Sequence, residues 1–347
     1  MSIGEFAAPT RIVAGRGAVA SALAAEVAAL GAGTVAVIAD RGFARAGLLE
    51  PIVARVPGAR VCALIGEDPD VAECEAAAGA AREAGADAVL AIGGGSALCA
   101  AKAVAILLRN ADPLERYEGV GRLASPPAPA VAVPTTAGSG SEVSNVVVLH
   151  DPGRERHLVI RGRGYEPRVA ILDGELLRTL PRAPMIAAAL DALSHALESG
   201  WARGATSVTR ALALAAGATL RTALPRALAG EVDSMQELVE ASAIANLACG
   251  NSGLGLVHAL SSAPSVHLPH GYQNGVLLPH VARFNGAAEP FEQLYEQIGF
   301  EARFRPGELS AGDIEAMVAA AMSNSFRANN VRESGEADLR AILAHAT

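Results

Sequence analysis

The stretch Asp87-Ala-Val-Leu-Ala-Ile92 runs directly into Gly93-Gly-Gly-Ser96. A short, continuous apolar run of this kind is typical of a strand that is buried on both faces of a parallel sheet. The glycines follow where the strand gives way to a helix, which we expect to run to about Leu108. Free backbone N–H groups and the positive end of the helix dipole can hold a phosphate at such a turn. Glycine allows close approach, and Ser96 could cap the helix. The segment matches neither GxGxxG nor a Walker A loop, so an ordinary tight turn remains an alternative.

The same alternation of strand and helix extends over the first half of the chain. Further apolar strands are predicted at 34–39, 130–134, 146–149 and 168–172, with a helix at about 71–84. Strands that alternate with helices indicate a mostly parallel sheet covered by helices. Residues 1–180 are therefore predicted to form an α/β domain of the dinucleotide-binding kind.

Beyond Pro181 the strand signals disappear. Alanine and other helix formers dominate residues 185–230, 234–250 and 310–322, and Pro184 is a suitable residue to open the first of these helices. Residues 181–347 are predicted to form a second domain that is all helical.

Composition narrows the classes of function. The chain is 51% hydrophobic and 18% charged, and its net charge of −8 argues against a nucleic-acid partner, which requires a basic patch. We expect no membrane span, because no long apolar stretch lacks charges, and no signal peptide, because the N-terminus has no basic and apolar leader. Four scattered cysteines without CxxC spacing favour reduced thiols and a cytoplasmic protein.

Two polar features accompany the predicted strands. The segment Pro134-Thr-Thr-Ala-Gly-Ser-Gly-Ser-Glu142 places hydroxyls and glycines directly after a strand, where they could donate to phosphate, ribose or carboxamide. Asp40 follows the strand at 34–39, where a carboxylate can accept from a ribose 2′-hydroxyl and would repel a 2′-phosphate. The loop could equally be an ordinary polar loop, and Asp40 could equally be a helix N-cap.

One carboxylate and three imidazoles in the second half offer a complete ligand set for a divalent metal. Asp191 and His195 are four residues apart, so on a helix they lie on one face. His258 and His270 follow, and four of the eight histidines fall between 258 and 280. Oxygen and nitrogen ligands of this kind suit Fe²⁺ or Zn²⁺ better than a thiolate-seeking ion.

In order and approximate spacing, these motifs resemble the iron-dependent (group III) alcohol dehydrogenases. The resemblance rests on Gly93-Gly-Gly-Ser-x5-Lys102, the 134–142 segment, Asp191-x3-His195, His258 and Pro269-His270-Gly271, and it extends from about Pro9 to the C-terminus. It implies an N-terminal dinucleotide domain, a helical domain and a site in the cleft between them.

The resemblance also assigns roles to individual residues. It implies that Asp191, His195, His258 and His270 bind Fe²⁺, or sometimes Zn²⁺. The pyrophosphate of NAD would lie on Gly93, Gly94, Gly95 and Ser96. The residues implied to line the cofactor site are Thr135, Thr136 and Ser141, while Asp40 would favour NAD over NADP. Asn274 looks like part of the family's segment after its last metal histidine. Members are commonly dimers or larger, so a homodimer is expected.

This chain departs from the family's usual pattern at three places. Cys99 stands where the glycine-loop motif usually has Asp, and Ser262 stands where a histidine near the nicotinamide is common. The interval from His258 to His270 is 12 residues, which is shorter than usual. With that histidine gone, His267 or Ser262 is the candidate for relaying the proton, because both are polar groups between two proposed ligands.

The predicted activity is metal-dependent interconversion of an alcohol and an aldehyde or ketone with NAD(H), acting mainly as a reductase on small molecules. Three alternatives remain open. A maleylacetate-reductase-like enzyme shares the missing Asp but is disfavoured by the intact Asp191 and His195. A dehydroquinate-synthase-like lyase would need more Lys and Arg than 185–280 offers. A non-catalytic relative would bind NAD without turnover.

Overall fold

The computed structural model describes residues 5–110, 113–154, 156–287 and 291–347, and it divides into two compact units. The sheet unit comprises residues 8–136 and 140–178. The helical unit comprises residues 179–347, together with a short N-terminal segment up to Ala7 and the three residues Ala137–Ser139. The predicted boundary at 180 lies beside the start of the long helical segment, but that prediction did not include the two short pieces.

The sheet unit is built on six strands in the order β1-β9-β6-β4-β2-β3, and every pairing between them is parallel. Their bounds are Arg11–Ala14 (β1), Val35–Asp40 (β2), Ala59–Ile65 (β3), Ala88–Gly93 (β4), Ala130–Pro134 (β6) and Val169–Leu172 (β9). The mostly parallel sheet predicted from the sequence is therefore confirmed. The edge strands β1 and β3 were not predicted.

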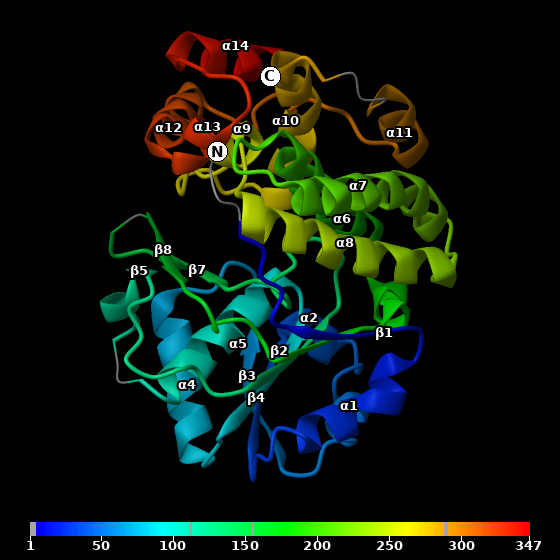
Figure 1. Ribbon diagram of the computed structural model, residues 1–347, viewed down its shortest axis with the longest axis vertical. Helices are drawn as coiled ribbons and strands as arrows, with labels where there is room; N and C mark the ends of the chain where they lie inside the picture. Colours follow the sequence, from blue (N-terminus) through cyan, green and yellow to red (C-terminus); the bar gives the residue numbers. More distant parts are fainter. Residues whose placement is uncertain (1–4, 111–112, 155, 288–290) are drawn as a thin grey trace. The chain divides into compact units, whose positions relative to one another are not determined.

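Alternate residues of the central strands enter two separate cores, one on each face of the sheet. Ile38 and Ala91 pack with α4 and α5 on one face, whereas Val37 and Leu90 pack with α1 on the other. Figure 1 shows these helices beside the sheet. Burial on both faces explains why these strands are continuous apolar runs. The helices of this unit are α1 (Ala18–Ala28), α2 (Arg41–Arg45), α3 (Glu50–Val53), α4 (Val71–Glu83), α5 (Gly95–Leu107) and the 3₁₀ turns η1 (Leu114–Tyr117) and η2 (Gly174–Thr179).

A second, three-stranded sheet holds β5 (Gly119–Val120), β8 (Arg156–Arg161) and β7 (Val146–Asp151). The strand predicted at 146–149 lies here, where it pairs antiparallel with β8, and not in the main sheet.

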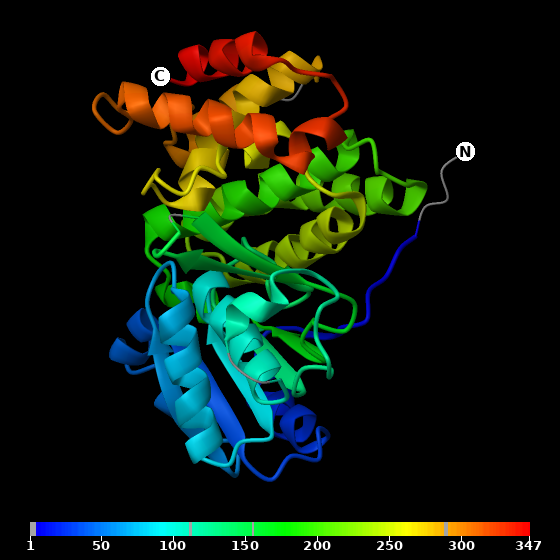
Figure 2. The ribbon, with the colours of Figure 1, turned by 90° about the vertical axis from the view of Figure 1, so that its left-hand side faces the viewer.

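The helical unit contains no strand among its described residues, as predicted. The long helices α6 (Arg182–Trp201), α7 (Ser207–Leu228) and α8 (Val232–Ser252) pack on one another, and α12 lies beside α14 (Figures 1 and 2). The remaining helices are α9 (Leu256–Leu260), α10 (His270–Asn285), α11 (Phe291–Ile298), α12 (Ala311–Ser323), α13 (Ser325–Asn329) and α14 (Glu336–Ala346). Pro184 does not open α6 as predicted. Pro181 occupies the N-cap, so Pro184 lies in the first turn instead.

Candidate active site

Helix α6 supplies two of the predicted metal ligands. Asp191 and His195 lie one turn apart in the middle of this 20-residue helix, and both are buried. The Nε2 atom of His195 lies 3.9 Å from Oδ1 of Asp191. The spacing of four residues thus places both side chains on one helix face, as predicted.

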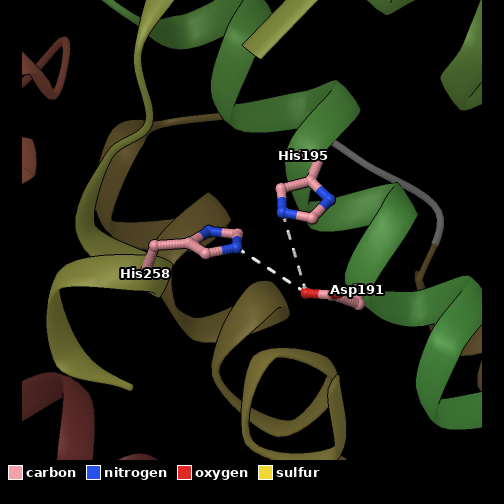
Figure 3. A group of neighbouring side chains, drawn as sticks. All are labelled: Asp191, His195 and His258. Carbon is pink, nitrogen blue, oxygen red and sulfur yellow. Dashed lines mark ion pairs between the residues drawn. The ribbon is translucent and has the colours of Figure 1, made fainter. Parts of the chain in front are cut away.

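Two other helices bring their histidines to the same carboxylate oxygen. Nε2 of His258, on α9, lies 3.6 Å from Oδ1 of Asp191, and Nε2 of His270, the first residue of α10, lies 3.9 Å from it. The rings of His195 and His258 stack at 4.6 Å between centroids. Figure 3 shows His195 and His258 both directed at Asp191. His258 is buried, whereas the side chain of His270 is 52% exposed, so the group opens toward solvent at His270.

Glycine allows α10 to approach α6 closely enough for this convergence. A Cβ at Gly271 would lie 2.3 Å from the carbonyl oxygen of Ala187 and 3.2 Å from the Cβ of Asp191. One turn later, a Cβ at Gly275 would lie 2.6 Å from Cδ1 of Leu190. The glycine of Pro269-His270-Gly271 therefore has a packing role, because it brings the start of α10 against the ligand turn of α6.

The electrostatics of the cluster depend on its burial and on the mixture of charges. Burial by itself raises the pKa of Asp191, but the imidazoles of His195, His258 and His270 outweigh burial and hold that pKa below its usual range. Burial lowers the pKa of His195 to about 4. Burial also disfavours a charged His258, yet its interactions with Asp191 and Glu198 raise the pKa of this imidazole to about 9.

Three side chains that the sequence did not single out as functional contact the predicted ligands. The amide nitrogen of Asn274 donates to Asp191 Oδ1 at 2.7 Å, and Glu198 accepts from Nδ1 of His258 at 2.6 Å. Asn246 lies 3.4 Å from Nδ1 of His195. Glu198 is seven residues after Asp191, so a periodicity of i, i+4, i+7 along α6 was the available signal.

The residues present suit a divalent metal. Ligand atoms about 2.0–2.2 Å from a tetrahedral ion lie roughly 3.4 Å apart, and the Asp191, His195 and His258 ligand atoms all lie within 4.8 Å of one another. Asn274, which donates to Asp191, also has a buried carbonyl oxygen, Oδ1, without a hydrogen-bond partner among the described residues. A carboxylate with neutral imidazoles is a ligand set for Fe²⁺ or Zn²⁺.

The predicted nucleotide segments of the sheet unit meet at the carboxyl ends of three neighbouring strands. Asp40 ends β2, Gly93 ends β4 and Thr135 follows β6. A Cβ at Gly93 would lie 2.8 Å from the Cβ of Asp40, and the N–H of Thr135 donates to the carbonyl of Gly93. The chain leaves β2 toward β3 and returns to β4 on the other side, so β2 and β4 flank a topological switch point. Open α/β sheets bind their ligands at such points.

One expectation in this region requires correction. Ser96 does not cap α5, because Gly94 is the N-cap and the Ser96 hydroxyl accepts from the N–H of Asp68. Lys102 of the glycine-loop motif is buried, and its ammonium group donates to the carbonyl oxygens of Ser144 and Val146. Asp40 is a helix N-cap, as one alternative had it, because Oδ1 accepts from the N–H of Phe43.

Further contacts join the glycine loop to the 134–142 segment. A Cβ at Gly94 would lie 3.3 Å from the Thr136 methyl group, and Sγ of Cys99 lies 3.4 Å from Oγ of Ser141. Cys99 also packs against the core on the α5 side of the sheet. The thiol therefore fills the position where the family usually has Asp, and it still touches the second loop.

The two candidates for proton relay lie beside α12 and α13. The Ser262 hydroxyl donates to the carbonyl of Ala259 and accepts from Asn324. His267 is exposed; hydrogen bonds from Ser310 lower the pKa of Asp313, and the nearby His267 contributes to the same shift. These contacts do not include the Asp191 cluster, so the relay role stays a prediction.

Comparison with known proteins identifies the family. Residues 9–174 match the iron-containing alcohol dehydrogenase family, and residues 185–291 match its C-terminal domain. The chain is 34% identical to the NAD-dependent methanol dehydrogenase of Bacillus methanolicus over 85% of this chain and 80% of that one. It is 32% identical to the lactaldehyde reductase of Escherichia coli (strain K12) over 78% and 73% of the two chains.

Solved structures agree with the sequence matches. The structure of a 1,3-propanediol oxidoreductase superimposes with a TM-score of 0.93 at 26% identity, covering all of both chains. That of the sulfoacetaldehyde reductase from Bifidobacterium kashiwanohense in complex with NAD⁺ gives a TM-score of 0.90 at 26% identity, covering 100% of this chain and 99% of that chain.

The chain therefore belongs to the iron-containing alcohol dehydrogenase family. This confirms the resemblance seen in the motifs and the expected class of enzyme, an oxidoreductase that interconverts alcohols and carbonyl compounds with NAD and a metal. Within the described ranges, no helix has the length and apolar character needed to cross a bilayer.

Proposed function

We propose that this protein reduces small aliphatic aldehydes with NADH, using a divalent metal held by Asp191, His195, His258 and His270. The convergence of three Nε2 atoms on Oδ1 of Asp191, at 3.6 to 3.9 Å, carries the proposal. Fe²⁺ is the first candidate because of the family, and Zn²⁺ suits the same ligands. The names of the relatives, which include a methanol dehydrogenase and a lactaldehyde reductase, support a small substrate.

The residues divide the work between the two units. Gly93, Gly94, Gly95 and Ser96 would hold the pyrophosphate, with Thr135, Thr136 and Ser141 along the cofactor. When bound, the nicotinamide carries the hydride and the metal polarises the carbonyl oxygen of the substrate. Asn274 orients the Asp191 carboxylate through its hydrogen bond, and the exposed side of His270 is where substrate can approach.

Individual residues are proposed to determine the choice of cofactor and the transfer of the proton. We propose that Asp40, at the end of β2, accepts from the ribose 2′-hydroxyl and so selects NADH over NADPH. His267 or Ser262 is proposed to pass the proton to the product oxygen. The enzyme is proposed to be a cytoplasmic homodimer.

The test is turnover by protein loaded anaerobically with Fe²⁺ or Zn²⁺. Short aldehydes, a ketone panel and maleylacetate would be assayed with NADH and NADPH, beside Asp40→Ala and a control variant at the exposed His345. We expect the parent protein to turn over short aldehydes with NADH. The ratio of activity with NADH to activity with NADPH should fall in Asp40→Ala and stay unchanged in the His345 control. Nucleotide binding without turnover of any carbonyl would contradict the proposal and support a non-catalytic relative.

A further inference from the structure

Glu198 is a buried carboxylate that contacts His258, one of the proposed metal ligands, and the backbone of the residue before it. Its side chain is completely buried, on the same face of α6 as Asp191 and two turns further along. Burying a carboxylate costs free energy unless each oxygen finds a donor. The surroundings of Glu198 therefore have to supply such donors.

The two oxygens of Glu198 contact the backbone of α9 and the imidazole ring of His258. Oε1 accepts from the N–H of Val257 at 2.6 Å, and Oε2 lies 2.6 Å from Nδ1 of His258. A carboxylate can only accept, so Nδ1 must carry the hydrogen. The proton on Nδ1 leaves Nε2, the atom directed at Asp191, free to offer its lone pair when the ring is neutral.

The chain before α9 is shaped around this carboxylate. A Cβ at Gly255 would lie 3.0 Å from Oε1 of Glu198 and 2.9 Å from Oδ1 of Asn330. Gly253, two residues earlier, has a φ of +74°, in the left-handed region that favours glycine. The Gly253-Leu254-Gly255 turn thus gives Glu198 the space to reach both partners.

We propose that Glu198 is a positioning residue of the metal centre, which fixes the tautomer and the orientation of His258. This inference rests on the proposed metal site. Glu198 also balances charge, because two buried carboxylates neutralise one divalent ion when the three imidazoles are neutral. Carboxylate partners of this kind typically change metal affinity roughly 10–100-fold when they are removed.

Glu198→Gln is the informative variant because it keeps the shape. If its amide oxygen accepts from His258, its NH₂ faces the N–H of Val257, donor against donor. If the amide is turned around, its NH₂ faces Nδ1, which moves the ring proton to Nε2 and blocks the lone pair. Either orientation therefore disrupts the hydrogen bonding that holds His258 in place.

The experiment measures metal affinity in the full-length protein. Zn²⁺ dissociation constants come from competition with a chromophoric chelator, and Co²⁺ absorption spectra report the geometry of the ligands. Ser194→Ala is the matched control, since among the described residues its buried hydroxyl donates only to the carbonyl of Asp191 on the same helix. Glu198→Asp, which keeps the charge but shortens the reach, serves as a second variant should Glu198→Gln fail to fold.

We expect Zn²⁺ binding to weaken roughly 10–100-fold in both Glu198 variants, with a changed Co²⁺ spectrum. The affinity for NADH, whose predicted loops lie in the sheet unit, should stay within about twofold of the parent, and Ser194→Ala should match the parent throughout. If a folded Glu198 variant bound metal as tightly as the parent, the role of Glu198 would be overturned and the proposed metal centre would stand. A parent protein that binds no metal would overturn the proposed metal centre, and this inference with it.

Discussion

Gly93→Ala tests the glycine loop of the sheet unit most severely. A Cβ at this position would lie 2.7 Å from the Cβ of Ala97 and 2.8 Å from the Cβ of Asp40. Carbon atoms in contact normally lie about 3.5–4.0 Å apart, and overpacking a core costs roughly 1–3 kcal/mol. The φ of Gly93 is +151°, and holding a non-glycine residue in such a conformation costs roughly 1–3 kcal/mol more. We therefore expect the free energy of unfolding to fall by roughly 2–6 kcal/mol.

The same substitution should weaken NADH binding. If the loop moves to relieve the overlap, it must return to its original position to bind NADH. Each kcal/mol of strain relieved in the free protein is then subtracted from the binding free energy, and about 1.4 kcal/mol corresponds to a factor of ten in affinity. Gly79→Ala is the matched control, because Gly79 lies inside α4 and its added Cβ would meet nothing within 4 Å beyond its chain neighbours and the nearby backbone of its own helix. That control should gain about 0.5–1 kcal/mol of stability and bind NADH like the parent.

The assay combines urea unfolding, followed by far-ultraviolet circular dichroism, with titration of NADH fluorescence. The reasoning would be refuted by a Gly93→Ala protein that is as stable as Gly79→Ala and binds NADH as tightly. A loss of stability with unchanged NADH affinity would refute the phosphate role of the loop but leave the packing argument intact.

Three further predictions concern other residues. Burial, only partly offset by a hydrogen bond from the residue's own backbone N–H and by Lys102, raises the pKa of Glu142 from 4.5 to about 7. The folded state therefore keeps a proton that the unfolded chain has lost, and the free energy of unfolding falls by roughly 3 kcal/mol as the pH rises between these values. Glu142→Gln should flatten that fall in urea titrations at pH 5 and 7.5, and an equal fall in both proteins would contradict the assignment. Gly271→Ala, whose Cβ would lie 2.3 Å from the Ala187 carbonyl, should lose Zn²⁺ affinity while NADH affinity stays unchanged; parent-like Zn²⁺ binding would contradict the packing role. His267→Ala should lower kcat by roughly a hundredfold if this residue relays the proton, and a parent-like pH–rate profile would eliminate His267 as the relay.

Local patterns in the sequence sufficed to predict the central strands and the proximity of Asp191 and His195. The strand predicted at 87–92 was found at Ala88–Gly93, because burial on both faces leaves a continuous apolar run. The edge strand β3 (Ala59–Ile65) was missed because most of its side chains are only partly buried or exposed, so its residues show no clear apolar pattern. Asp191 and His195 were predictable because their relation is one helical turn.

Features that depend on which elements pack together were not predictable. The strand at Val146–Asp151 pairs with β8 in a separate sheet, and strand pairing is not encoded in the strand's own residues. The burial of Lys102 depends on the packing around α5, which is buried on nearly all sides, and its ammonium group donates to backbone carbonyls. The i, i+4, i+7 spacing places Glu198 on the same face of α6 as Asp191, but its contact with His258 depends on how α9 packs against α6.

The most direct test of the metal centre is the metal content of the protein by inductively coupled plasma mass spectrometry. The parent, His258→Ala and His270→Ala would be prepared anaerobically with Fe²⁺ and, in parallel, with Zn²⁺, and His345→Ala would serve as the control. The convergence on Asp191 predicts about one ion per chain in the parent and the control, and loss of that ion in both ligand variants. A parent without stoichiometric metal, or a His270→Ala protein that retains it fully, would contradict the proposed four-ligand centre.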